Sequence, residues 1–170
     1  MITVFLSYAH AEKDKMQNLK SGIETICELR KIEIEILYDD KSIVGGREWQ
    51  PEIEKLIERS SMVIVLFTSS AFDSEYIKKE IEHAKKNGKV VIPILFESDK
   101  KIPEYVKSIH TIFSDKYNEP KIMWNYLIDI ITSSPDDTPR STHNLYVASL
   151  NYRGGKSTTI ATIRGLISEN

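Results

Sequence analysis

The sequence predicts an α/β fold in which five parallel strands form a flavodoxin-like sheet of order 2-1-3-4-5, with helices on both faces. Two observations lead to this prediction. Short β-rich runs alternate along the chain with segments whose apolar residues recur at helical spacing. The loops between them are short, and strand-helix-strand repeats of this kind form right-handed units on a parallel sheet.

The five predicted strands are residues 2–7, 32–37, 62–67, 89–95 and 110–114. The third, MVIVLF, is continuously apolar, which is typical of a strand covered by helices on both faces. The second, IEIEIL, alternates apolar and charged residues, as expected at a sheet edge with one wet face. The fourth contains Pro93, which cannot donate to a strand ladder and predicts a local irregularity. The fifth strand, residues 110–114, has the weakest sequence signal.

Four helices are predicted from apolar residues that share one helical face. These residues include Leu19 and Ile23, Ile53 and Ile57, Ile77 and Ile81, and Leu127 and Ile131. The third helix has Asp73 or Ser74 as its natural N-cap, and it is expected to break at Asn87 and Gly88. The stretch TSSAFDS before it is predicted to be a loop.

Composition narrows the class of protein. With 170 residues, the chain is long enough for one domain of ordinary size and a short appendage. A net charge of −2 gives no general attraction to nucleic acid, and no apolar run is long enough to cross a membrane. Cys27 is the only cysteine, so no internal disulfide can form and a reducing compartment is expected. We therefore expect a cytoplasmic protein with no nucleic-acid or membrane partner.

Residues 1–133 are predicted to form the domain, residues 134–142 a linker, and residues 143–170 a C-terminal extension. The linker is polar and contains two prolines. The extension contains GGKST, but a phosphate-binding loop requires a glycine five positions before Gly155, and Leu150 stands there. The extension is interpreted as a truncated or degenerate start of a P-loop-like second domain, with an ordinary strand and helix as the alternative.

Several kinds of site are excluded because their motifs are absent. The histidines are scattered and have no cysteine partners, so no metal site is expected. The chain has no Gly-x-Ser-x-Gly elbow and no Gly-x-Gly-x-x-Gly fingerprint, which argues against a serine hydrolase and against a Rossmann-type dinucleotide site. In this fold the ligand crevice lies beyond the carboxyl ends of the strands. The candidate residues are therefore those in the loops after the first three strands.

Three boxes of the sequence resemble those of TIR domains (Toll/interleukin-1 receptor and resistance-protein type). The first box is VFLSYAHAEKD, an apolar strand that ends in Phe-x-Ser-Tyr. The second and third run from Asp39 through Gly46-x-x-Trp49 and a serine pair to an aromatic-x-x-x-Glu, here Tyr76 to Glu80. The similarity covers residues 1–133 and looks closest to prokaryotic members, which have compact loops like these.

The resemblance implies one of two functions. Many TIR domains of prokaryotes cleave NAD⁺ between nicotinamide and ribose, and they release ADP-ribose or a cyclic ADP-ribose-type signal in immune or stress signalling. Others are non-catalytic adaptors that bind further TIR domains. The first function is favoured, with NAD⁺ as the substrate and no separate cofactor. The expected partners are further TIR domains and a downstream effector or fused sensor domain.

Glu80 is the position that the resemblance assigns as catalytic, because it is the glutamate of the third box. Nicotinamide leaves NAD⁺ as a neutral molecule, so the remaining burden is the positive charge that develops on the ribose, which one fixed carboxylate can stabilise. Position alone favours a solvated helix glutamate paired with a lysine or with His83. The third box favours catalysis over that alternative.

The resemblance also suggests further residues of the site. The substrate-binding candidates are Ser7, Tyr8, Gly46, Arg47, Trp49, Ser69 and Tyr76. The loop after the second strand corresponds to the family's assembly loop and carries Asp39, Asp40 and Gly45. Arg47 is a candidate for a cation that some family enzymes carry after the first strand, with a solvated loop arginine as the alternative. For Tyr8 and Trp49 the alternative is packing.

Overall fold

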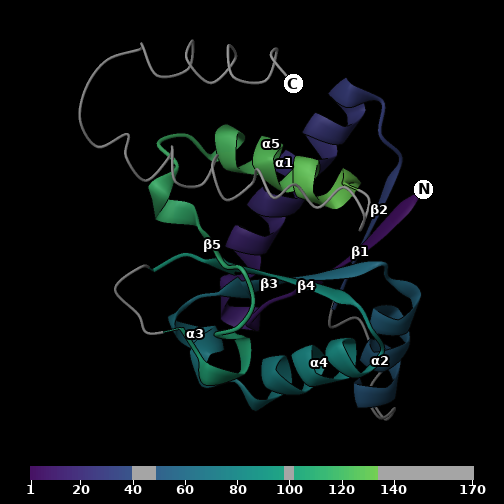
Figure 1. Ribbon diagram of the computed structural model, residues 1–170, viewed down its shortest axis with the longest axis vertical. Coiled ribbons are helices and arrows are strands. Elements are labelled where there is room, and N and C mark those ends of the chain that lie inside the picture. The colour runs from purple at the N-terminus through teal and green to yellow at the C-terminus, as the bar shows by residue number, and fades with distance from the viewer. Residues whose placement is uncertain (40–48, 98–101, 134–170) are drawn as a thin grey trace, which may run out of the picture. The chain divides into compact units, whose positions relative to one another are not determined.

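The computed structural model describes residues 1–39, 49–97 and 102–133, which belong to one compact unit, Met1–Ser133. Strands and helices alternate along this unit (Figure 1). The linker predicted at residues 134–142 and the extension predicted at residues 143–170 lie outside the described residues.

A parallel sheet forms the centre of the described chain. Its strands are β1 (Ile2–Ser7), β2 (Ile34–Tyr38), β3 (Met62–Phe67), β4 (Val90–Leu95) and β5 (Ile112–Phe113). They lie in the order β2-β1-β3-β4-β5, and each neighbouring pair is parallel. The predicted flavodoxin-like order is confirmed, and the carboxyl ends of all these strands therefore lie along one edge of the sheet.

Helices cover both faces of the sheet, as predicted (Figure 1). Those on one face are α1 (Lys13–Arg30) and α5 (Pro120–Thr132), and those on the other are α2 (Trp49–Arg59) and α4 (Glu75–Lys86). Strand side chains alternate between the two apolar cores. Val4 and Leu6 of β1 pack beneath α1 and α5, whereas Phe5 packs beneath α2 and α4. This alternation also decides the side on which a residue at a strand end projects.

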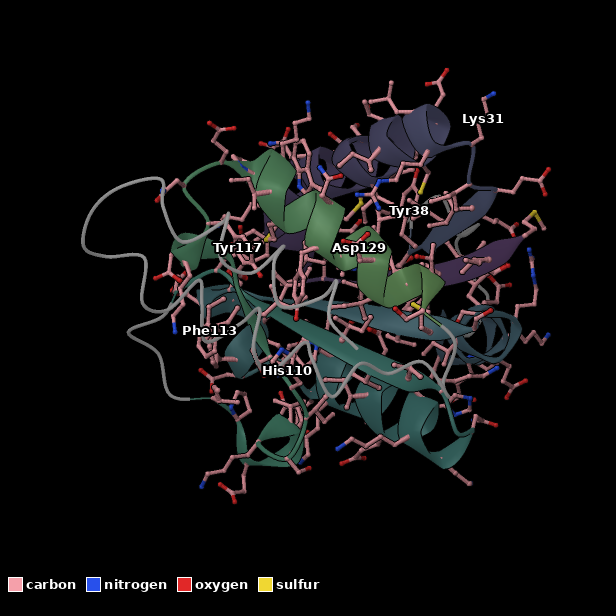
Figure 2. All side chains as sticks on the ribbon, turned by 45° about the horizontal axis from the view of Figure 1, so that its top comes forward. Lys31, Tyr38, His110, Phe113, Tyr117 and Asp129 are labelled. Atoms are coloured by element: carbon pink, nitrogen blue, oxygen red, sulfur yellow. The ribbon has the colours of Figure 1, made fainter. Side chains whose placement is uncertain are left out.

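The second strand begins later than predicted, at Ile34 instead of residue 32. The residues before it still close α1. Lys31, at the exposed end of that helix (Figure 2), has a left-handed φ of 57°, and the N–H of Ile32 donates to the carbonyl of Cys27 at 2.8 Å. The helix cap therefore takes up the first residues that the alternating pattern had assigned to the strand.

The fourth and fifth strands correct two further predictions. β4 runs without the irregularity expected at Pro93, which pairs in register with Val65 of β3. β5 is two residues long instead of spanning 110–114, and it pairs only with Ile94 and Leu95. No residue of β5 lies opposite Pro93, so the missing N–H breaks no ladder on that side.

The helix α4 begins and ends as its sequence predicts. The hydroxyl of Ser74 accepts the N–H of Ile77 at 3.4 Å and caps the first turn. Gly88, with a φ of 66°, follows the last turn. The stretch before α4 was predicted to be a loop, but it contains one helical turn, α3 (Ser69–Phe72), in which the N–H groups of Ala71 and Phe72 donate to the carbonyl of Thr68.

Gly22 allows α1 to pack against Trp124 of α5. A Cβ atom at this position would lie 2.3 Å from the indole ring. We predict that Gly22→Ala lowers the free energy of unfolding by roughly 1–3 kcal/mol, because the overpacking outweighs the gain of about 1 kcal/mol in helix propensity. Urea unfolding measures the effect, with Ser21→Ala as a control at an exposed neighbour. Equal or greater stability of Gly22→Ala would contradict the packing described.

Candidate active site

Two neighbouring strands end in polar residues that project toward α4. Ser7 is the last residue of β1, and Asp39 directly follows β2. Phe5 and Leu37, two residues before each of them, belong to the core beneath α2 and α4. Because strand side chains alternate with a period of two, Ser7 and Asp39 project on this same side of the sheet. Both side chains are buried.

Glu80 reaches the end of β1 from α4. One face of this helix is buried in the core through Ile77, Ile81 and Ala84, whose packing holds α4 against the sheet. Glu80 is 6% exposed, and the Ser7 hydroxyl donates a hydrogen bond of 2.5 Å to its Oε2 atom. The alternative of a solvated helix glutamate is therefore wrong. His83 does not pair with Glu80; its Nε2 lies 3.1 Å from the carboxylate of Glu58.

Burial raises the pKa of Glu80 from 4.5 to about 7. The hydrogen bond from Ser7 opposes this shift, because it favours the ionised carboxylate and lowers the pKa. The nearby negative charge of Asp39 raises the pKa further. Glu80 is consequently poised to change its charge near neutral pH, as a general base or an electrostatic catalyst at such a pH would be.

Asp39 is the second buried carboxylate of this region. It is 6% exposed, and the Nε2 atom of His10 lies 3.1 Å from its Oδ2 atom. The hydroxyl of Tyr8 donates to the backbone carbonyl of Asp39 at 2.9 Å, which fixes the chain just after β2. The rings of Tyr8 and His10 meet edge to face, with their centroids 5.9 Å apart. We call Ser7, Tyr8, His10, Asp39 and Glu80 the acidic site.

Two further candidates, Tyr76 and Ser69, are among the described residues. Tyr76, one helical turn before Glu80, is 57% exposed. The side chain of Ser69 donates to the carboxylate of Glu97, and its backbone N–H donates to the same group at 3.2 Å. Substrate binding by Tyr76 and Ser69 stays a prediction.

Four of the predicted site residues, Asp40, Gly45, Gly46 and Arg47, lie outside the described residues. Trp49 begins α2 as predicted, but its side chain is likewise not described.

Asp39 was predicted only as part of an assembly loop, and no role in the site was predicted for His10. The nearness of Asp39 to Glu80, and of His10 to Asp39, was missed. The available signal was the strand period: Ile36 and Tyr38 face the core beneath α1 and α5, so Leu37 and Asp39 are expected on the opposite side of the sheet. A role of Asp39 in assembly stays a prediction.

Neither a metal centre nor a spanning helix is found in the described part of the chain. No group of three or more potential ligands among these residues could hold a metal ion. None of the described helices is long and apolar enough to cross a membrane.

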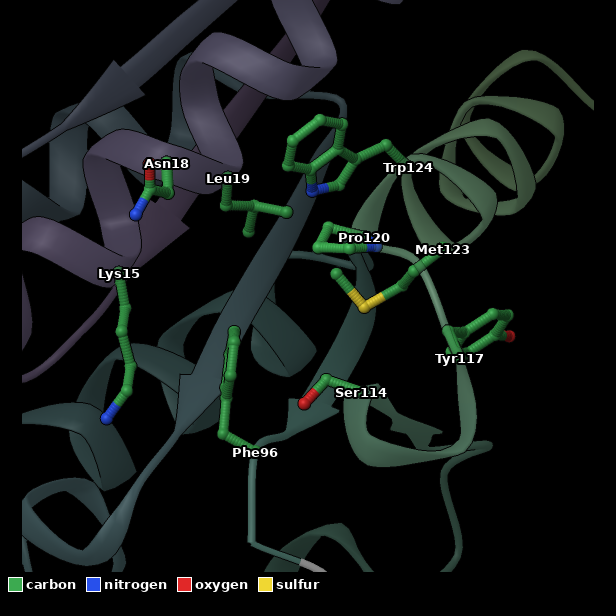
Figure 3. Close-up of a pocket in the computed structure, with 9 residues that line it drawn as sticks. All are labelled: Lys15, Asn18, Leu19, Phe96, Ser114, Tyr117, Pro120, Met123 and Trp124. Atoms are coloured by element: carbon green, nitrogen blue, oxygen red, sulfur yellow. The ribbon is translucent and has the colours of Figure 1, made fainter.

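A cavity of about 420 Å³ lies between α1 and α5, on the face of the sheet opposite to Glu80 (Figure 3). Leu19, Phe96, Met123 and Trp124 are among the residues that line it. None of its lining residues belongs to the acidic site, so the two features are separate.

An open parallel sheet with a buried glutamate over the carboxyl end of its central strands defines a flavodoxin-like α/β protein with an acidic site. A family model described as a TIR domain matches residues 4–122. The match covers more than half of the chain, which therefore belongs to the TIR domain family. A search of curated proteins found no match.

Solved structures of the same fold include three with similar extent. The TIR domain of the Toll-related receptor TRR-2 from Hydra magnipapillata is 18% identical with a TM-score of 0.61, covering 75% of this chain and 96% of its own. A prokaryotic SEFIR domain is 17% identical to this chain with a TM-score of 0.60, and the match covers 82% of this chain and 97% of the SEFIR domain. The CMP N-glycosidase BcmB of Clostridium botulinum is 19% identical to this chain with a TM-score of 0.53, and the match covers 75% of this chain and 98% of BcmB. These likenesses show the shared fold.

The raised pKa of Glu80 predicts a pH-dependent loss of stability. Between pH 4.5 and about 7 the unfolded chain releases this proton before the folded chain does, so the free energy of unfolding falls as the pH rises. We predict that wild type loses roughly 2–3 kcal/mol relative to Glu80→Gln between pH 5 and pH 8. Urea unfolding at both pH values measures this difference.

The matched control for this measurement is Glu82→Gln, an exposed position on the same helix. It should follow the wild-type pH dependence. The burial of an ionisable Glu80 would be contradicted if Glu80→Gln also kept the wild-type dependence.

Proposed function

We propose that this TIR domain cleaves the bond between nicotinamide and ribose in NAD⁺, with Glu80 as its catalytic carboxylate. The observation that carries the proposal is the burial of Glu80 at the carboxyl end of β1, where the Ser7 hydroxyl holds it. A buried carboxylate without a paired cation costs stability, and such groups cluster at functional sites. The described contacts of Glu80 include no lysine or arginine.

The reaction needs the kind of group that Glu80 provides. The bond between C1′ of ribose and the ring nitrogen breaks with its electron pair on nicotinamide, which leaves as a neutral molecule. No general acid is required for this departure. The ribose acquires oxocarbenium character, and a fixed negative charge in a site of low dielectric stabilises it more than water does.

A pKa of about 7 suits Glu80 to a second task. Water that attacks C1′ releases one proton, and an ionised Glu80 accepts it, which yields ADP-ribose, nicotinamide and a protonated enzyme. Release of that proton to solvent restores the starting state. Attack by a nitrogen of the adenine ring yields a cyclic product in place of ADP-ribose. A base with a pKa near the working pH is the most effective for such a transfer.

Two further observations support a site of this class. The CMP N-glycosidase of the same fold is named for cleaving a bond between a ribose and a base, which is the bond type proposed here. The carboxyl ends of β1 and β3 flank the reversal of strand order, where ligands of such sheets bind. The proposal includes self-association through contacts between TIR domains and a role in prokaryotic immune or stress signalling.

We predict that Glu80→Gln reduces nicotinamide release from NAD⁺ by about 10²-fold or more, because one preorganised charge is lost while the side-chain size is kept. The release rate is measured on the full chain across protein concentrations and with a crowding agent, since a site completed by a second copy is inactive when dilute.

Glu82→Gln serves as the control and should retain wild-type activity. Equal release by wild type and Glu80→Gln would overturn the catalytic assignment. Absence of release from wild type under all of these conditions would favour the alternative of a non-catalytic adaptor.

A further inference from the structure

The carboxylate of Asp39 lacks the donors that buried acceptors normally have. Neither of its oxygens is accessible to solvent, and neither accepts a hydrogen bond from any described residue. The Nε2 atom of His10 lies 3.1 Å from Oδ2, which is an ion-pair distance, but it does not satisfy that oxygen as a hydrogen-bond donor. The backbone of the same residue, by contrast, is fixed by Tyr8.

Such an arrangement is costly for folding. Leaving a buried acceptor unsatisfied costs about 1–3 kcal/mol, and more when the group is charged. The negative charge of Asp39 also opposes the ionisation of Glu80. Replacement by an apolar residue would remove both costs, and the ion pair with the partly exposed His10 offsets little of them. A ligand that donates hydrogen bonds to Asp39 would explain why a carboxylate stands at this position.

We propose that Asp39 is a substrate-binding residue whose two buried carboxylate oxygens accept hydrogen bonds from the adjacent hydroxyls of a ribose, the ribose whose C1′ atom faces Glu80. This inference rests on the proposed function for the identity of the sugar. A carboxylate offers two oxygens in one plane, and a vicinal diol offers two donors at a matching separation.

The alternatives fit the residues less well. A divalent cation requires more ligands than the described part of the acidic site provides, since no group of three or more is found there. Ordered water can serve Asp39 in the free protein, and a diol that reproduces its hydrogen bonds can displace it.

The positions of Asp39 and Glu80 also suit them to different roles in the site. Glu80 projects from α4, and Asp39 projects from the end of β2, on the same side of the sheet. Asp39 would fix the ring of the sugar by its hydroxyls, and Glu80 would act on the anomeric carbon. Hydrogen bonds from a ribose to Asp39 spread its charge and so weaken its opposition to the ionisation of Glu80.

The test compares two probes that differ by one sugar. ADP-ribose carries the terminal ribose with its diol, and ADP lacks it. Their dissociation constants are measured by calorimetry on the full chain at pH 8, where Glu80 is ionised in wild type and in Asp39→Asn alike. We expect wild type to prefer ADP-ribose, and we expect Asp39→Asn to weaken ADP-ribose binding by about 10-fold to 100-fold while ADP binding is unchanged.

Asp115→Asn, which removes an exposed carboxylate elsewhere, should leave both affinities at wild-type values. The thermal unfolding midpoint of Asp39→Asn confirms that the variant is folded, and loss of a buried charge is expected to maintain or raise it. The inference is overturned if wild type binds both probes equally, or if Asp39→Asn weakens both or neither.

The test is separable from that of the proposed function. Neither probe contains the bond to nicotinamide, so discrimination between them does not require catalysis. Nicotinamide release without a preference for ADP-ribose would remove only the role of Asp39. A preference that depends on Asp39, without nicotinamide release, would remove only the cleavage of NAD⁺.

Discussion

The hydrogen bond from the Ser7 hydroxyl to the buried Glu80 carboxylate is the interaction on which the acidic site depends. It joins the end of β1 to the middle of α4, and the two residues lie 73 positions apart in the sequence. Burial disfavours the ionised form of Glu80, and the hydroxyl partly restores it, which leaves the pKa at about 7. A buried carboxylate of this kind costs stability, and such groups cluster at functional sites.

The fold explains why the polar residues meet. A parallel sheet brings the carboxyl ends of its strands to one edge, and β2, β1 and β3 are neighbours there. The strand period directs Ser7 and Asp39 to the face that α4 covers. The same face buries Ile77 and Ile81, so the packing that holds α4 also sets the position of Glu80. The packing of the apolar core thus determines the positions of the acidic-site residues, because Ser7 and Asp39 stand where β1 and β2 end.

The fold was predictable from the sequence because its signals are local and repeated. Continuous apolar runs marked β3 and β4, helical spacing marked α4, and Ser74 and Gly88 marked the ends of that helix. The errors lay where contacts between elements determine the structure. The residues that cap α1 make β2 begin later than predicted, and β5 is too short to have a residue opposite Pro93, so the proline interrupts no ladder there. Glu80 was identified through resemblance, whereas its burial and its bond to Ser7 were not predictable, since both depend on how closely α4 approaches the sheet. The place of Asp39 could have been inferred from strand alternation, but its unsatisfied oxygens could not.

The central claim is that Glu80 is a buried carboxylate that titrates near neutral pH and is held by Ser7. Its most direct test is an NMR titration of the Glu80 side-chain carbon in the full chain, assigned by comparison with Glu80→Gln. The account predicts a midpoint near pH 7 in wild type and a higher midpoint in Ser7→Ala, because loss of the donor further disfavours the ionised form. Ser60→Ala removes another buried hydroxyl, one that donates to the carbonyl of Ile57, and should leave the midpoint unchanged. A wild-type midpoint near 4.5, the ordinary value for a glutamate, would contradict the account.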